Sequence, residues 1–550
     1  MQHCSQDVSC HPVPLRRAIV LTDTDFEVVI AGSGVGGLIA AIRTSTSGKR
    51  TLLVEAAAKY GGTSALSAGR VWFPKAPAQD LSHADSAERY LDALMPDSRE
   101  AVRAFMEASQ RVFPFVEANS RHRFTVCPNY PDYHQELEDA SPGGRCYDSA
   151  VVSIHDLLPE AREVRESPGY IPILQREWEE WRYPENFDWQ LITERYERGQ
   201  RTGGYALVAA LVDGALRAGA TLVRNTKLVD IEVTATGVAG VRLEADGENI
   251  DVTCSNVILS TGGFDGSQER RAEFLAGVTV SGSAPSNTGV ALDIAEKLDL
   301  PQGDMSLAWL MPMAEVPGDT VDGHPYPRFL PRERAVPNCV IVNAGGERFA
   351  NEAAPYHRFV TAMLQSGSEE DPTAYLIFDE EYRRRYPFPG LSRTGRLEGP
   401  FVIAESMVDL ATKIGVPSYA LEATIRRWND FCGAGADEDF HRGGNAYDRH
   451  NGDPWQKGNP CLGPVDTPPY YATRILPGTI GSKGGLVTDA SSRVVDHNGA
   501  PIVGLYAAGT VAATWTGDTY PGPGFPLSLS MAAGLVAAEQ ISRSDRAVGV

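Results

Sequence analysis

Residues 26–55 carry the pattern that most narrows how this chain can fold. A short apolar run leads into Gly32, Gly34 and Gly37, which have the spacing Gly-x-Gly-x-x-Gly. The first glycine allows a tight turn, the second lets the backbone approach a pyrophosphate, and the third lets a helix pack on the strand. A second apolar run ends at Glu55, where an acid can bind the ribose hydroxyls. A turn without a ligand would not need this order of strand, helix, strand and acid, so we predict a dinucleotide site.

Other glycine-rich segments extend this site. The loop 60–69 combines glycines with serines and threonines, and such a loop is costly to order unless something packs on it. Residues 257–264 form an apolar strand that ends in a Gly-Gly turn, and a short strand is expected over 504–509. The further residues that we expect to contact the dinucleotide are Gly61, Gly62, Thr63, Ser64, Gly262 and Gly509.

The order of elements predicts an α/β fold with a Rossmann-like, doubly wound parallel sheet and a small antiparallel layer. Prolines and aromatic residues become frequent near residue 304, which indicates an inserted α+β capping domain, and the strand pattern of the first domain resumes near residue 475. We therefore divide the chain into an N-terminal extension (1–24), a first part of the dinucleotide domain (25–303), the capping domain (304–474) and a second part of the dinucleotide domain (475–550). Residues 171–200, rich in Trp, Glu, Arg and Tyr, fit either a lid or an insertion.

Composition excludes several classes of function. The formal net charge of -21 argues against nucleic acid and against an anionic membrane surface. No segment approaches the roughly 18 apolar residues of a spanning helix, and residues 1–24 lack the apolar core of a signal peptide. The eight cysteines show no metal or redox spacing, which favours free thiols in a reducing, cytoplasmic setting. We predict no metal site and expect Asp437, Glu438 and Asp439 to form a solvated acidic face.

Five separated motifs resemble one flavoprotein family over residues 25–542. They are Gly32–Gly37 with Gly61–Ser64, Ser260–Gly263, Asn343–Tyr356, Asp437–Gly443 with Tyr447–Arg449, and Gly484–Asp489 leading to Thr519–Gly524. In this order they are similar to the fumarate reductase and succinate dehydrogenase superfamily. The run Tyr520-Pro-Gly-Pro-Gly524 is similar to the branch of 3-ketosteroid Δ1-dehydrogenases. The resemblance implies non-covalent FAD, a small apolar 3-ketosteroid substrate and an electron acceptor such as a quinone.

The resemblance also implies roles for four residues in removing the C1 and C2 hydrogens of ring A. Tyr520 and the N–H of Gly524 match the pair that polarises the C3 ketone, Tyr356 matches the tyrosine that takes the C2 proton, and Tyr133 matches the assisting tyrosine. The chemistry needs such groups, because the protein must stabilise an enolate and supply a base while the flavin takes the hydride. A free phenol has a pKa near 10, so Tyr356 needs a donated hydrogen bond or a helix N-terminus to act as a base.

Several alternatives stay open from the residues themselves. Tyr130 shares its loop with Tyr133, Tyr356 could be a core tyrosine, and the Tyr520–Gly524 loop could be only a rigid turn. Phe525-Pro526 departs from the small residues that usually follow this loop, which leaves the particular substrate open. The other hypotheses are a desaturase of another bulky cyclic ketone and an enoate or fumarate reductase.

The remaining polar residues near these motifs receive structural interpretations. The arginine donor of the reductases has no match that we can identify in this sequence. We interpret Asn351 and Glu352 as a turn and helix cap. No role is assigned to the lone histidines His134, His324, His357 and His441.

Overall fold

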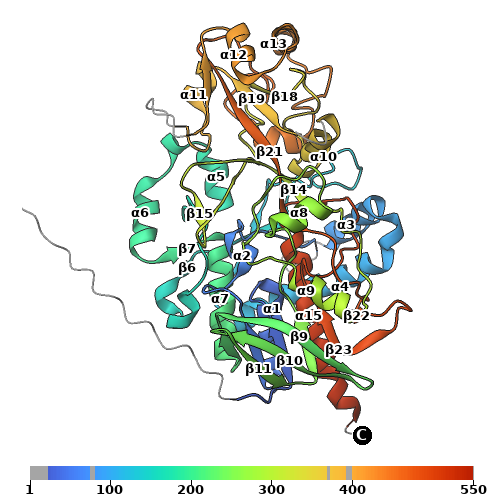
Figure 1. Ribbon diagram of the computed structural model, residues 1–550. Coiled ribbons are helices and arrows are strands. Elements are labelled where there is room, and N and C mark those ends of the chain that lie inside the picture. Colours follow the sequence, from blue (N-terminus) through green and yellow to red (C-terminus); the bar gives the residue numbers. More distant parts are fainter. Residues whose placement is uncertain (1–22, 75–80, 368–371, 392–398, 549–550) are drawn as a thin grey trace, which may run out of the picture.

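The computed structural model describes residues 23–74, 81–367, 372–391 and 399–548. Its lower half in Figure 1 is built on a six-stranded sheet with the order β22-β23-β12-β1-β2-β8. Five strands of this sheet pair in parallel, and β22 pairs antiparallel with β23 at the edge. The strands are β1 (Val28–Ala31), β2 (Thr51–Val54), β8 (Thr221–Val223), β12 (Asn256–Leu259), β22 (Arg493–Val495) and β23 (Pro501–Ala507). The predicted parallel sheet is confirmed.

The two faces of this sheet are covered by different layers, because successive side chains of a strand point to opposite faces. Val28 and Ile30 pack into one core with helices α1 (Val35–Thr46), α7 (Gly203–Arg217) and α15 (Phe525–Val548). Val29 and Ala31 pack into a second core on the other face. That core is completed by α9 (Val290–Lys297) and by the antiparallel sheet of β9 (Thr226–Thr234), β10 (Gly237–Ala245) and β11 (Glu248–Thr253). This sheet is the antiparallel layer predicted from the sequence.

Helices α1 and α15 touch backbone to backbone. A Cβ placed on Gly534 would lie 2.1 Å from the carbonyl oxygen of Gly36, and a Cβ on Gly36 would lie 2.8 Å from the carbonyl oxygen of Ser530. A side chain at either position would separate the two helices. The helix that follows the first glycine motif is therefore fixed against the helix that follows Tyr520–Gly524.

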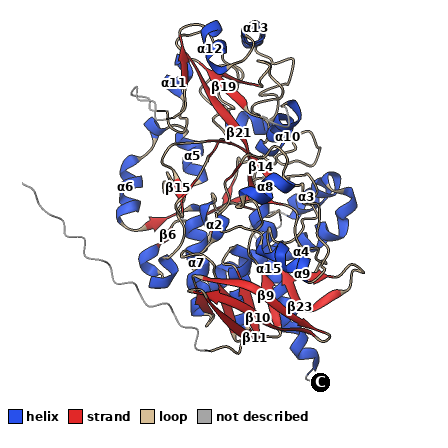
Figure 2. Cartoon of the chain, in the orientation of Figure 1, coloured by secondary structure: helices blue, strands red, loops and turns tan. Residues whose placement is uncertain are grey.

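The upper half of the molecule contains a second sheet with the path β17-β14-β21-β19-β18, and β13 and β20 also pair with β21 (Figure 2). Its strands are β13 (Val280–Ser281), β14 (Ala308–Ala314), β17 (Arg328–Phe329), β18 (Cys339–Val342), β19 (Ala374–Phe378), β20 (Val402–Ala404) and β21 (Tyr470–Ser482). The helices of this half are α10 (Tyr356–Ser366), α11 (Glu380–Arg385), α12 (Met407–Ile414), α13 (Ser418–Ala434) and α14 (Ala446–Asn451). The domain boundaries at 303/304 and 474/475 stay a prediction.

The remaining strands and α-helices lie outside these three sheets and the helices named with them. A three-stranded sheet has the order β3-β5-β4, and short pairs join β6 to β7 and β15 to β16. The strands are β3 (Val71–Trp72), β4 (Phe124–Cys127), β5 (Cys146–Ser149), β6 (Val152–Ser153), β7 (Gln200–Arg201), β15 (Thr320–Val321) and β16 (His324–Pro325). The helices are α2 (Gly62–Leu66), α3 (Leu81–Leu94), α4 (Arg99–Asn119), α5 (Gln175–Trp181), α6 (Trp189–Glu197) and α8 (Gln268–Phe274).

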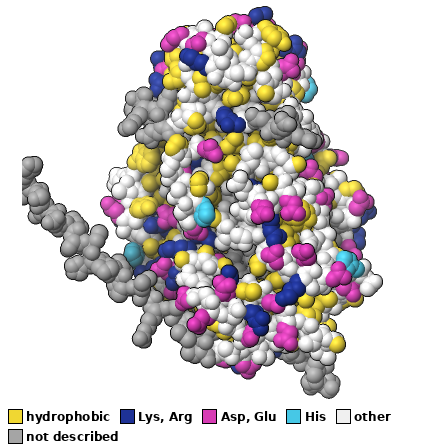
Figure 3. Space-filling view, in the orientation of Figure 1, with side chains coloured by type: hydrophobic (Ala, Val, Ile, Leu, Met, Phe, Trp, Pro, Cys, Tyr) yellow, Lys and Arg dark blue, Asp and Glu magenta, His cyan; other side chains and the backbone are white. Residues whose placement is uncertain are grey.

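The visible surface carries acidic and basic side chains interspersed with each other (Figure 3). Within the described part of the chain, no helix combines the length and the apolar character that a membrane crossing requires.

Candidate functional site

A cavity of about 410 Å³ opens at the carboxyl ends of β1, β2 and β12. In open α/β sheets ligands bind at this edge. Its lining includes most of the residues predicted to contact the dinucleotide, namely Gly32, Gly34, Glu55, Gly62, Thr63, Ser64, Gly262 and Gly509. Gly37 and Gly61 do not line it. Residues 226–229 and 286–288 also line it, and the sequence analysis did not single them out.

The three glycines of the first motif are needed for different structural reasons. A Cβ on Gly32 would lie 2.2 Å from the carbonyl oxygen of Ser260, and one on Gly37 would lie 2.2 Å from the carbonyl oxygen of Gly32. At Gly34, however, the nearest atom would be the Ser64 Oγ at 3.6 Å, and φ is an ordinary -63°. No protein neighbour forbids a side chain at Gly34, so the space there suits a bound group. This cradle at the start of α1 fits the pyrophosphate of a dinucleotide.

Glu55 is held in place by its own neighbours. Its Oε2 accepts hydrogen bonds from the N–H (3.1 Å) and the hydroxyl of Ser33, and its Oε1 accepts one from the N–H of Ala57 (3.0 Å). The Ser33 Oγ also accepts a hydrogen bond from the N–H of Gly61 at 2.8 Å. Ser33 thus joins the first and second glycine loops. It occupies a variable position of the motif, so the motif alone could not identify it.

The predicted catalytic tyrosines meet in one buried cluster, although they come from three distant segments. The Tyr133 hydroxyl donates a hydrogen bond of 2.7 Å to the Tyr356 hydroxyl. The Tyr520 ring lies 5.1 Å from the Tyr133 ring and 5.3 Å from the Tyr356 ring, measured between centroids. Tyr130 instead stacks on His450, with ring centroids 4.7 Å apart. Of the two tyrosines in this loop, Tyr133 is the one bonded to Tyr356.

Backbone contacts hold the loops of this cluster together. The carbonyl oxygen of Pro521 accepts hydrogen bonds from the Tyr133 N–H (2.9 Å) and the Tyr90 hydroxyl (2.6 Å). Gly524 has a φ of +88°, and a Cβ there would lie 2.3 Å from the carbonyl oxygen of Arg70. Within the described residues the Gly524 N–H donates no hydrogen bond. A bound acceptor could take that donor.

The electrostatics of the cluster keep its phenols protonated. Burial raises the pKa of Tyr133 and of Tyr356 well above 10. Burial also raises the pKa of Tyr520, and the hydrogen bond with the Tyr356 hydroxyl offsets part of this rise. For Tyr356, the hydrogen bond donated by Tyr133 opposes the rise in pKa. Tyr356 is the first residue of α10, where the helix dipole also favours a negative charge.

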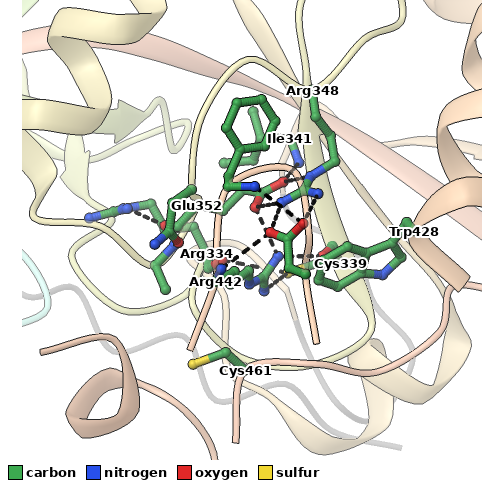
Figure 4. Close-up of polar contacts among 12 residues, drawn as sticks. Arg334, Cys339, Ile341, Arg348, Glu352, Trp428, Arg442 and Cys461 are labelled. Atoms are coloured by element: carbon green, nitrogen blue, oxygen red, sulfur yellow. Dashed lines mark hydrogen bonds and ion pairs between the residues drawn. The ribbon is translucent and has the colours of Figure 1, made fainter. Parts of the chain in front are cut away.

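A buried ion network lies directly before Tyr356 in the chain (Figure 4). The Glu352 carboxylate is 2.7 Å from Arg348 and 3.3 Å from Arg442, and Arg348 also contacts Asp437 at 2.9 Å. The interpretation of Glu352 as a helix cap was therefore wrong, since α10 is capped at Pro355. The solvated face predicted for Asp437, Glu438 and Asp439 was wrong for Asp437, whose side chain is buried, whereas Glu438 and Asp439 are exposed. Arg348 and Glu352 are four residues apart, and Asp437 and Arg442 join them from a distant segment.

Two further polar residues beside the cluster were missed. The His357 Nδ1 accepts a hydrogen bond from the Leu310 N–H at 3.2 Å, and its Nε2 lies 3.0 Å from the Asp518 carboxylate. The Lys483 ammonium donates to the carbonyl oxygens of Gly517 (2.7 Å) and Thr519 (2.8 Å). These contacts hold the chain just before Tyr520. A lone histidine or lysine in the sequence gives no sign of such a role.

No group of three or more His, Cys, Asp or Glu side chains within the described ranges is arranged to hold a metal ion.

Comparisons with known proteins show which family the chain resembles. Residues 27–527 match the family described as "FAD binding domain". The chain is 34% identical over 538 residues to 4-oxocyclohexanecarboxylate 2-dehydrogenase of Sinomonas cyclohexanicum, covering 94% of this chain and 93% of that protein. It is also 34% identical over 571 residues to 3-oxosteroid 1-dehydrogenase of Mycolicibacterium smegmatis, covering 96% and 99%. The solved 3-ketosteroid Δ1-dehydrogenase of Sterolibacterium denitrificans, in complex with 1,4-androstadiene-3,17-dione, matches with a TM-score of 0.88 and 32% identity over 95% of this chain and 100% of that one.

Proposed function

The chain belongs to the flavoprotein family with this FAD binding domain, in the branch that contains the 3-oxosteroid 1-dehydrogenases, and from this we propose that it desaturates a cyclic ketone beside its carbonyl. It is an FAD-dependent oxidoreductase. The substrate proposed first is ring A of a 3-ketosteroid, which loses its C1 and C2 hydrogens. The observation that carries the proposal is the buried hydrogen bond between the hydroxyls of Tyr133 and Tyr356, beside Tyr520 and Gly524.

Stabilising the enolate is the larger task for the protein. The C3 ketone oxygen accepts hydrogen bonds from the Tyr520 hydroxyl and the Gly524 N–H. These donors suit the role because the Tyr520 phenol stays protonated and the Gly524 N–H has no other partner among the described residues. Each donor to such an oxyanion is worth about 3–4 kcal/mol of the barrier.

Tyr356 takes the C2 proton in this proposal. Burial makes its phenolate scarce and strongly basic, because the pKa lies well above 10. The hydrogen bond from Tyr133 and the N-terminal position in α10 both favour the phenolate. The ion network at Glu352 fixes the backbone that presents Tyr356. Tyr133 therefore assists the base, and Tyr356 Oη carries the proton.

FAD supplies the acceptor for the hydride that leaves C1. We propose that its adenosine end lies in the cavity at Gly34 and Glu55, whose lining residues fit it. A quinone or a similar carrier is the proposed electron acceptor. Six cysteines within the described residues are unpaired, which supports a reducing, cytoplasmic setting.

The test is anaerobic mixing of the purified flavoprotein with 4-androstene-3,17-dione while the flavin absorbance is followed. We expect the flavin to be bleached and the 1,4-diene to form. The relatives also include a dehydrogenase named for 4-oxocyclohexanecarboxylate, so that ketone belongs in the same screen. If dithionite-reduced enzyme is reoxidised by fumarate while no ketone bleaches the flavin, the enzyme is an enoate reductase and the proposal is wrong.

A further inference from the structure

Three arginines lie together beside the tyrosine cluster, and we call Arg70, Arg182 and Arg332 the arginine cluster. The Arg70 guanidinium lies 5.6 Å from the centre of the Tyr130 ring. Those of Arg332 and Arg182 lie 3.2 and 4.7 Å from the centre of the Trp178 ring. The Tyr130 and Trp178 rings both pack on one imidazole, that of His450. Three cations thus surround one small aromatic group.

No member of the arginine cluster forms an ion pair with any carboxylate in the described ranges. Arg70 is half-buried, its buried Nε has no partner, and its side chain donates no hydrogen bond to another described residue. Arg332 donates from Nη2 to the Gln175 Oε1 (2.7 Å), while its buried Nε has no partner. Arg182 donates only to backbone carbonyls, those of Glu179 and His450. Guanidinium groups that are partly buried and lack a carboxylate partner are costly, so this arrangement favours an anionic ligand.

Three acidic side chains near the arginine cluster accept hydrogen bonds from backbone or amide groups and not from a guanidinium of the described residues. Asp148 accepts a hydrogen bond from the Gln175 N–H (2.5 Å), and Glu179 accepts one from the Gln175 side-chain amide (2.9 Å). Glu333 accepts the backbone N–H of Arg332 (3.0 Å). Burial, with the positive charges of Arg70 and Arg182, lowers the pKa of Arg332 to about 10. Burial opposes it, but the negative charge of Asp148 raises the pKa of Arg70 above its ordinary value, so Arg70 keeps its positive charge.

The arginine cluster begins at the loop that is proposed to bind the ketone. The backbone of Arg70 touches Gly524, since a Cβ on that glycine would lie 2.3 Å from the Arg70 carbonyl oxygen. The Arg70 guanidinium therefore lies at most one arginine side chain away from the backbone that contacts Gly524. One ligand could contact both groups if its carbonyl and its anionic group lie at opposite ends of a single ring.

We propose that Arg70 and Arg332 bind a carboxylate carried by the substrate, and that the substrate is a single-ring ketone with a carboxylate across the ring from its carbonyl. This inference rests on the proposed function for the reaction at the ketone, and it replaces the 3-ketosteroid proposed first by a smaller cyclic ketone. The guanidinium fork suits a carboxylate, because two parallel N–H donors match its two oxygens. A steroid acid carries its side-chain carboxylate on the far ring of four, beyond the reach of Arg70.

The first experiment compares substrates with the FAD-loaded wild-type protein. The probes are 4-oxocyclohexanecarboxylate, its methyl ester, 4-androstene-3,17-dione and 3-oxo-4-cholen-24-oic acid. We expect kcat/KM for the single-ring acid to exceed that for its ester by about 10- to 100-fold, the worth of a hydrogen bond to a charged group. Equal values for acid and ester would overturn the proposal. A preference for either steroid would overturn it too, while leaving the proposed reaction in place.

The second experiment uses Arg70→Met, which keeps an unbranched apolar stem and removes the charged guanidinium. The preference for acid over ester should fall about 10- to 100-fold, mainly through KM. Arg176→Met is the matched control, because Arg176 is exposed on α5 outside the arginine cluster. An unchanged preference in Arg70→Met, or an equal fall in the control, would contradict the proposal.

Calorimetric titration with the acid separates this inference from the proposed reaction. Suppose that the wild type binds the acid, Arg70→Met does not, and the wild type turns over no ketone. This result would overturn the proposed reaction and support the carboxylate site. Absence of both binding and turnover would overturn both. Thermal unfolding of each variant shows whether it is folded.

Discussion

Replacing Tyr520 by phenylalanine removes one hydroxyl and leaves the surrounding packing in place. The Tyr520 ring is buried, and its centroid lies 4.8 Å from that of Trp309, 5.1 Å from that of Tyr133 and 5.3 Å from that of Tyr356. A phenylalanine keeps these ring contacts, so the free energy of unfolding should change by only about 1 kcal/mol. The barrier to enolate formation, by contrast, should rise by about 3–4 kcal/mol, which is about 10²–10³ in rate.

Single-turnover reduction of the flavin by the best ketone substrate, in the absence of oxygen, measures this loss. The flavin content and the thermal midpoint of Tyr520→Phe should match those of the wild type. Tyr447→Phe is the control within the same cluster: its ring centroid lies 5.1 Å from that of Tyr133, and its hydroxyl is buried without a partner. That variant should lose far less activity. An unchanged rate in Tyr520→Phe, or an equal loss in both variants, would refute the role given to Tyr520.

Three further perturbations test other parts of the site. Because burial raises the pKa of the base well above its ordinary value, kcat/KM of the wild type should keep rising with pH through the alkaline range, and Tyr133→Phe should lower it about tenfold at each pH; a plateau near neutrality would contradict this. Gly34→Ala should lose FAD while the apoprotein melts normally, whereas Gly32→Ala should lower the melting temperature of the apoprotein itself. Arg348→Met should cost about 3–5 kcal/mol in urea unfolding. Burial would raise the pKa of Glu352, but the charge of Arg348 outweighs it and lowers that pKa. The stability that this ion pair contributes is therefore fully present above about pH 4.3 and is lost as the pH falls through the lower pKa of the folded state. This loss of stability in acid should be missing from the pH profile of Arg348→Met.

The parts of the fold that depend on local sequence were predictable. The strand, turn and helix around Gly32 are specified within a few residues of each other, so the spacing of the glycines was enough to identify them. The same holds for α15, which was expected near Pro526 and begins at Phe525. Periodicity and turn residues act over short distances, and one sequence records them directly.

The parts that depend on contacts between distant segments were not predictable in this way. Glu352 and Asp437 were assigned to a helix cap and a solvated face, because nothing near them in the sequence indicates that Arg348 joins them in a buried network. Arg70 drew no attention either, since only the folded chain brings its guanidinium to Tyr130 and its backbone to Gly524. Charged residues lie mostly at the surface, so the sequence favoured an exposed interpretation for Asp437.

The close contact between α1 and α15 couples two binding events. The start of α1 lines the cavity proposed for FAD, and α15 starts directly after Gly524, so the Gly36–Gly534 contact makes the two helices one rigid unit. A ligand that orders one end of this unit reduces the entropy that a second ligand must lose at the other end. By linkage, bound ketone should then tighten the retention of FAD by the same factor by which FAD tightens the binding of ketone.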